Sequence, residues 1–132
     1  MANFTLKELM ASTTATAQKI PNVPTPEQEK NLQKLIDNIL QPLRDAYGKP
    51  IRVNSGFRSP ELNAFLKGSK TSQHMKGQAA DITGGSKAEN KVLFNLIRSL
   101  NLPFCQLIDE KNLSWVHVSY DENNVKRQVL YL

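Results

Sequence analysis

Two histidines and one nearby carboxylate are the residues of this sequence with the clearest potential for metal chemistry. The chain has 132 residues and two histidines, His74 and His117, and Asp81 follows the first of them after a short polar segment. Two imidazoles and one carboxylate form a common catalytic zinc set, which leaves the fourth coordination position to water. Each histidine considered alone is more often structural, so the elements that carry the set decide its meaning.

The spacing of these residues excludes one familiar kind of zinc site. His74 and Asp81 are too far apart for adjacent turns of one helix, and the His-Glu-x-x-His pattern of helical zinc peptidases is absent. Segment 115–119 alternates, so its two valines should face one side of a strand and His117 the other. A loop that carries His74 can converge with such a strand. The spacing therefore permits a metal site without requiring one.

The helices and strands that must position these residues follow an order along the chain, in which most predicted helices come first and most predicted strands come last. Capping boxes, proline starts and apolar steps of three and four residues predict helices over 5–10, 26–48, 59–66 and 86–100. Short β-branched or alternating segments predict strands over 51–55, 79–83, 104–110, 115–120 and 126–132.

Within this pattern, Pro42 should bend the long helix or mark its last turn. Residues 11–19 have weak periodicity, and we predict no regular element for them. The order of elements indicates an α+β fold in which helices pack on a small antiparallel sheet. The length fits one domain over 1–132.

Composition and charge exclude several classes of protein. The apolar content of 39% and charged content of 22% are those of an ordinary soluble globular chain. No stretch approaches the roughly 20 apolar residues that span a bilayer. A single cysteine, Cys105, excludes an intrachain disulfide framework and a Cys-rich zinc site. The net charge of +5 suits polyanionic partners, but we expect no nucleic acid, because no basic helix or aromatic–basic alternation supports it.

Several motifs occur together along the chain. They are Asn3-Phe4-Thr5-Leu6-x-Glu8-Leu9, Leu40-x-Pro42-Leu43-Arg44, Ser55-Gly56-Phe57-Arg58-Ser59-Pro60-x-x-Asn63, Ser72-x-His74-x-x-Gly77-x-Ala79-x-Asp81 and Trp115-x-His117. This combination resembles the zinc D-alanyl-D-alanine carboxypeptidase family. Relatives of that family include VanX dipeptidases, phage L-alanoyl-D-glutamate endolysins and the hedgehog-type zinc fold. The resemblance covers nearly the whole chain and implies that fold.

The resemblance also implies a ligand set: His74, Asp81 and His117 bind Zn²⁺. The zinc would lower the pKa of its bound water toward 7 and polarise the scissile carbonyl.

Other positions of the family motif imply contacts with the substrate. Arg58 matches the family arginine that anchors a carboxylate or steadies the oxyanion, a task that suits its planar fork. The alternative for Arg58 is an ion pair that braces a loop. Ser72 and Gln73 would line the cleft and bind the substrate backbone, or would form a turn that only positions His74.

The general base is where this sequence departs from the family pattern. Several relatives carry an acid three residues before the last histidine ligand, and here that position is Ser114. Compact relatives instead show an acidic segment that maps onto Asp109 and Glu110. Strand alternation lets only one of the two face the metal. Glu110 shares its face with the polar Gln106 and Asp109 shares its face with Leu107, so we favour Glu110.

These observations predict a zinc metallopeptidase that hydrolyses a peptide bond in peptidoglycan stem or cross-bridge peptides. The alternative is a catalytically weak or inactive zinc domain that binds cell-wall peptide or a protein partner, and Ser114 is its main support. Lys7 and Glu8 interrupt any apolar signal region, so we expect synthesis in the cytoplasm. We favour a phage-like protein that acts on the wall after phage-mediated release, and the alternative is a bacterial enzyme that is exported by another route or recycles wall peptides inside the cell. The bond cut, the endo- or carboxypeptidase mode and the oligomeric state stay open.

Overall fold

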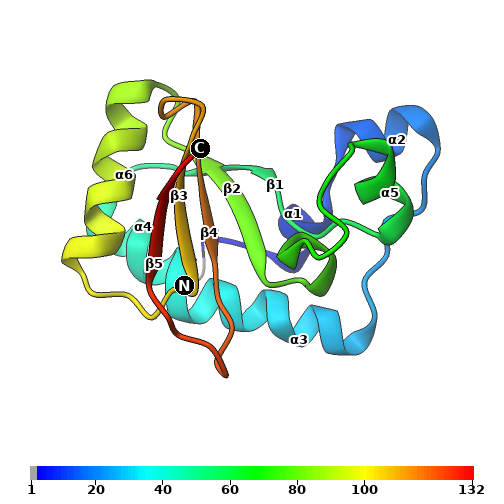
Figure 1. Ribbon diagram of the computed structural model, residues 1–132, viewed down its shortest axis with the longest axis horizontal. Helices are drawn as coiled ribbons and strands as arrows, with labels where there is room; N and C mark the ends of the chain where they lie inside the picture. The colour runs from blue at the N-terminus through cyan, green and yellow to red at the C-terminus, as the bar shows by residue number, and fades with distance from the viewer. Residues whose placement is uncertain (1–2) are drawn as a thin grey trace.

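Five strands form one sheet at the centre of the fold. The computed structural model describes residues 3–132, so the first two residues of the predicted domain lie outside the described residues. The strands are β1 (Arg52–Ser55), β2 (Ala79–Thr83), β3 (Gln106–Glu110), β4 (Trp115–Ser119) and β5 (Gln128–Tyr131). They lie side by side in the order β1-β2-β4-β3-β5 (Figure 1). The predicted α+β fold is confirmed.

One strand pair departs from the predicted antiparallel sheet. Neighbouring strands run antiparallel except β3 and β5, which are parallel. The connection over 120–127 leaves the end of β4, passes the start of β3 and reaches the free edge of that strand. A two-residue hairpin would have returned β5 against β4, whereas a longer connection can skip one strand.

The helices precede the sheet or lie between its strands. They are α1 (Leu6–Met10), α2 (Thr13–Gln18), α3 (Pro26–Leu35), the π-helical η1 (Ile36–Leu40), α4 (Gln41–Tyr47), α5 (Pro60–Phe65), the 3₁₀ turn η2 (Gln73–Lys76) and α6 (Lys87–Ser99). Helix α2 lies where we predicted no regular element. The signal for it is Ser12, whose side chain accepts from the Ala15 N–H at 3.1 Å. Within residues 3–132, no helix combines the length and apolarity needed to cross a membrane.

The predicted long helix is continuous through α3, η1 and α4, and its irregularity precedes Pro42. Proline has no N–H to donate to the carbonyl of Asn38, so the regular ladder is interrupted there. The turn before it widens to the π form, in which the Gln41 N–H donates to the Ile36 carbonyl. The proline thus changes the hydrogen-bond pattern one turn before itself.

The hydrophobic core lies between the sheet and the helices α3, η1, α4 and α6 (Figure 1). Buried helix residues include Leu35, Ile39 and Ile97. Val116 and Val118 of β4 are fully buried against them, as the alternation predicted. His117, which lies between the two valines, therefore projects from the other face of the sheet.

Gly56 allows α1 to lie against the end of β1. A Cβ atom at this position would lie 2.2 Å from the Leu9 carbonyl oxygen, which also accepts from the Phe57 N–H at 2.7 Å. We expect Gly56→Ala to lower the free energy of unfolding by about 1–3 kcal/mol, because the overlap involves backbone. Urea denaturation measures this, with the exposed Asn54→Ala expected to stay within about 0.5 kcal/mol. Equal midpoints for both variants would contradict the close approach.

Candidate metal centre

Three candidate ligands meet on the sheet face opposite the helical core. His74 comes from η2, Asp81 from β2 and His117 from β4, and the last two are direct partners in the β2–β4 pairing. The Asp81 Oδ1 atom lies 3.0 Å from His117 Nδ1 and 3.4 Å from His74 Nε2. The three ligand atoms all lie within 4.8 Å of one another.

The short η2 turn delivers His74 to this cluster. The Ser72 hydroxyl accepts from the His74 N–H at 3.2 Å and thereby caps the turn. Gly77 ends the turn at a φ of 73°, in the left-handed region that favours glycine, and directs the chain into β2. A Cβ atom at Gly77 would lie 2.5 Å from the Gln28 carbonyl oxygen, so α3 also presses against this turn.

A backbone carbonyl sets the orientation of the His74 ring. The His74 Nδ1 atom lies 2.7 Å from the Gly56 carbonyl oxygen, and because a carbonyl only accepts, Nδ1 carries the proton. In the neutral ring, Nε2 then presents its lone pair toward Asp81. Metal-binding histidines usually have such a partner on the other ring nitrogen. The donor set and this orientation fit a zinc ion.

Asp81 is a buried carboxyl that remains ionised. Its burial raises the pKa, but hydrogen bonds and charge from His117 and His74 outweigh the burial and hold the pKa below its ordinary value. The Arg58 guanidinium lies 3.5 Å from the other carboxylate oxygen and adds a further positive neighbour. Asp81 is therefore available as a negatively charged ligand.

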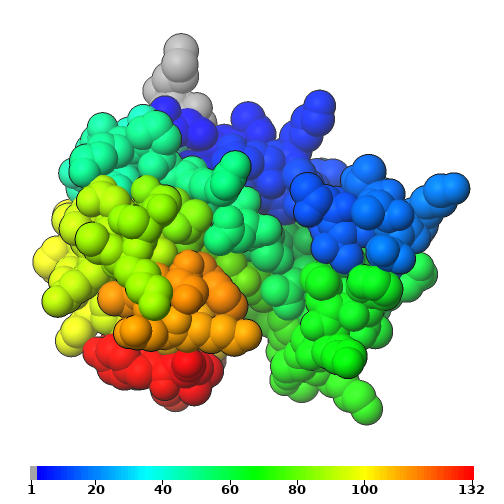
Figure 2. All heavy atoms as spheres, turned by 90° about the horizontal axis from the view of Figure 1, so that it is seen from above, coloured from blue at the N-terminus to red at the C-terminus, as the bar shows by residue number. Residues whose placement is uncertain are grey.

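A pocket of about 420 Å³ opens beside the cluster. Its lining comes from the loop before η2, from η2 itself, from β3 and β4, and from the β4–β5 connection: Ser69, Thr71, Ser72, Gln73, Lys76, Cys105, Gln106, Ile108, Glu110, His117, Asp121, Asn124 and Lys126. The molecule is hollowed between the β3–β4 region, orange in Figure 2, and the segment after α5, green. We call this hollow the site pocket.

Comparison with known proteins agrees with this geometry. The profile of the Peptidase M15 family matches residues 2–119. The chain belongs to the peptidase M15 family. It is also similar to a zinc D-Ala-D-Ala carboxypeptidase of Streptomyces albus G, with 51% identity over 49 residues, which are 36% of this chain and 19% of that protein. The chain thus spans about a fifth of the length of that curated relative.

Arg58 of this M15 chain lies directly beside the candidate metal ligands. Arg58 donates from Nε to the Ser55 hydroxyl at 3.1 Å, and its two terminal nitrogens lie 3.5 Å from Asn63 Oδ1 and from Asp81 Oδ2. Its side chain is largely buried, so these contacts hold the guanidinium in one place. The ion pair with Asp81 agrees with the alternative interpretation of Arg58, and its contact with a substrate stays a prediction.

Of the three predicted substrate-contact residues, Ser72 and Gln73 line the site pocket and Arg58 does not. Ser72 also positions His74, as the alternative interpretation held. Gln73 differs from Ser72 in its hydrogen bonding. Its Oε1 atom is buried, and no group within residues 3–132 donates to it. Its amide nitrogen lies 3.6 Å from the sulfur of the buried Cys105. Gln73 Oε1 is therefore a buried acceptor without a donor among the described residues.

The register of β3 and β4 separates the two acids considered as general base. Glu110 and His117 lie on the same face of the sheet and both line the site pocket. Asp109 points to the other side, where its Oδ1 accepts from the Leu113 N–H at 2.7 Å. Ser114 donates to a backbone carbonyl within the same β3–β4 turn. Of the two acids, Glu110 is thus the one beside the metal cluster.

Proposed function

We propose that this M15 protein is a zinc-dependent peptidase that hydrolyses a peptide bond in peptidoglycan stem or cross-bridge peptides. The observation that supports it most is that His74, Asp81 and His117 lie together beside a pocket that His117 and Glu110 line. The Streptomyces relative is a zinc D-Ala-D-Ala carboxypeptidase, which supports both the metal and a peptide with D-amino acids. Action on the cell wall follows from this substrate.

The candidate ligands, Glu110 and Arg58 would each have a separate role in hydrolysis. Zinc held by His74, Asp81 and His117 would activate a water molecule and polarise the carbonyl. Glu110 accepts the proton of the attacking water and passes it to the leaving amine. Arg58 directs its guanidinium N–H groups to the developing negative charge or to a substrate carboxylate.

Two further residues hold the peptide during this reaction. Gln73 lines the site pocket and would bind the peptide backbone through its side-chain amide. Ser72 lines the same pocket beside it. Both line the same pocket as Glu110, so the bound peptide and the proposed base would share one hollow.

Analysis of cleavage products tests the proposed function directly. Purified peptidoglycan is incubated with the zinc-loaded protein and with His74→Ala, and the soluble products are identified by mass spectrometry. We expect new amino and carboxyl termini at one bond, absent with the variant. If several wall chemotypes release nothing while one zinc per chain is bound, the protein is instead the non-catalytic wall-binding domain that Ser114 suggested.

Asn63 is a residue of the site for which the sequence indicated no role. It is 3% exposed, and its amide donates to the Ser69 carbonyl at 2.9 Å while Oδ1 faces Arg58. A Cβ atom at Gly68 would lie 2.2 Å from that Oδ1 atom, so the loop closes directly over the amide. Asn63 thus joins Arg58 to the loop at the rim of the site pocket.

We expect Asn63→Ala to lower kcat about tenfold, because Arg58 loses the Asn63 oxygen that helps to hold its guanidinium in place. The same change should lower the free energy of unfolding by about 1–3 kcal/mol, because the buried partners of Asn63 lose their hydrogen bonds. Zinc content should stay at the wild-type level. Asn63→Asp keeps the acceptor toward Arg58 and should recover most of kcat. Steady-state kinetics on a stem peptide and urea denaturation measure both effects. Equal loss of kcat in the two variants would mean that the contact with Arg58 is unimportant.

A further inference from the structure

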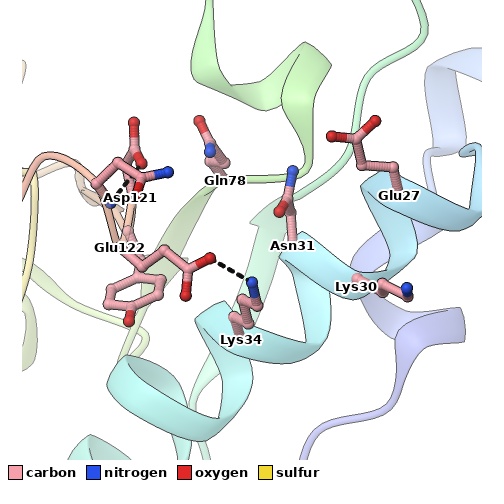
Figure 3. A pocket seen from close by; sticks show the side chains of 9 residues that line it. Glu27, Lys30, Asn31, Lys34, Gln78, Asp121 and Glu122 are labelled. Carbon is pink, nitrogen blue, oxygen red and sulfur yellow. Dashed lines mark hydrogen bonds and ion pairs between the residues drawn. The ribbon is translucent and has the colours of Figure 1, made fainter.

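A second cavity, of about 530 Å³, lies between α3 and the β4–β5 connection (Figure 3). We call it the α3 cavity. Its lining is polar throughout: Glu27, Lys30, Asn31, Lys34, Gln78, Tyr120, Asp121, Glu122 and Asn123. The volume is within the range of small-ligand sites. None of these residues belongs to the metal cluster.

The α3 cavity adjoins the site pocket. Asp121 lines both hollows. On the opposite side, Lys76 lines the site pocket and Gln78 lines the α3 cavity, only two residues further along the chain. Asn31 binds this segment to α3, because its amide donates to the Lys76 carbonyl at 2.9 Å. A peptide several residues long that enters the site pocket can therefore continue into the α3 cavity.

The charges of the α3 cavity favour a cationic group. Lys34 is already paired with Glu122 at 2.6 Å, and the Lys30 side chain points away from the other labelled side chains (Figure 3). Within residues 3–132, neither Glu27 nor Asp121 forms an ion pair with a cation. The lining therefore has three carboxylates and two lysines, and of the carboxylates only Glu122 is in an ion pair, while Asp121 Oδ1 accepts from the Asn123 N–H at 3.0 Å.

Primary amides complete the lining with groups suited to a peptide backbone. The side chains of Gln78, Asn31 and Glu27 project to the same side of the cavity (Figure 3). The Gln78 side chain has no hydrogen-bond partner within residues 3–132, so both its donor and its acceptor are available. Amide groups of this kind bind peptide N–H and C=O groups, whereas carboxylates bind an ammonium.

We infer that the α3 cavity is an extension of the substrate groove and that it binds a diamino acid residue of the peptide through its primary ammonium group. This inference rests on the proposed function, because it assigns the cavity to the same peptide. The Gln78 amide and the Asn31 Oδ1 atom take the peptide backbone, while the Asn31 nitrogen keeps its bond to Lys76, and Glu27 and Asp121 take the ammonium.

The experiment compares two stem peptides, L-Ala-γ-D-Glu-L-Lys-D-Ala-D-Ala and the same peptide acetylated on the lysine side chain. Values of kcat/KM are measured for the zinc-loaded wild type, for Glu27→Gln and for the control Glu29→Gln, an acid of the same first helical turn outside the cavity. We expect the wild type and the control to prefer the free amine about fivefold, as a partly exposed ion pair allows, and Glu27→Gln to lose the preference.

The outcomes separate this inference from the proposed function. Cleavage of both peptides by the wild type with equal kcat/KM would overturn the inference and leave the peptidase intact. If neither peptide is cleaved, each is titrated into isotope-labelled zinc-loaded protein and the backbone amide signals of Asn31 and Gln78 are followed by NMR. Signal shifts with the free-amine peptide but not with the acetylated peptide would support the α3 cavity as a binding site without hydrolysis. If neither peptide shifts these signals, the inference is overturned.

Discussion

Replacing Asp81 with alanine is expected to abolish stoichiometric zinc binding and to lower peptide hydrolysis by on the order of 10³-fold or more. The carboxylate is the centre of the cluster, because one oxygen faces both histidines and the other faces Arg58. Without it, two imidazoles remain beside an uncompensated guanidinium, which repels a divalent cation. Loss of metal removes several kcal/mol of transition-state stabilisation, and each 1.36 kcal/mol is a factor of ten.

Metal analysis after gel filtration and the initial rate on a stem peptide measure this prediction. The wild type stripped with a chelator serves as the matched control, because it should lose activity and regain it when zinc is added back. The Asp81→Ala variant should not respond to added zinc. A variant that holds one zinc per chain with wild-type affinity would show that the ligand set is different.

Replacing Glu110 with glutamine is expected to lower kcat by on the order of 10²- to 10⁴-fold while zinc binding and stability stay unchanged. The substitution keeps the size of the side chain and removes its ability to accept a proton. Glu110 lines the pocket with His117 and is a surface-accessible member of the site face, so its neutralisation should leave the core intact.

Asp109→Asn is the matched control for Glu110→Gln, since the two acids are adjacent in β3 and the changes are chemically equivalent. Asparagine keeps an oxygen that can accept from the Leu113 N–H, so the β3–β4 turn and the hydrolysis rate should both persist. Steady-state kinetics on one stem peptide compares the pair. The assignment of the base would be reversed if Asp109→Asn lost activity and Glu110→Gln retained it.

Local signals predicted most of the helices. Thr25 and Gln28 form a capping box at the start of α3, and Ser86 caps α6, as the sequence pattern indicated. Helix α2 escaped prediction because it is six residues long and buries only Ala15, so it has almost no apolar periodicity. Short helices that depend on one cap and one contact leave little trace in a sequence.

The order of the strands could not be predicted from the same local signals. Alternation identifies a strand and its two faces, but it does not say which neighbour a strand pairs with or in which direction. The parallel position of β5 beside β3 follows from the free edge that β3 offers once β4 and β2 are paired. The position of β5 therefore depends on how the other strands of the sheet are paired.

For the candidate site, the order of elements predicted the α+β fold and the donor chemistry of His74, Asp81 and His117 permitted a metal site, because these are properties of the chain. The resemblance of the motifs to a known family implied the full ligand set and the role of Arg58. Only the tertiary structure decided which acid lies beside His117, because that depends on the register of β3 against β4. It also decided that Asn63 contacts Arg58 and that the α3 cavity adjoins the site pocket. These features join residues far apart in the sequence, and long-range packing, which no local pattern encodes, brings them together.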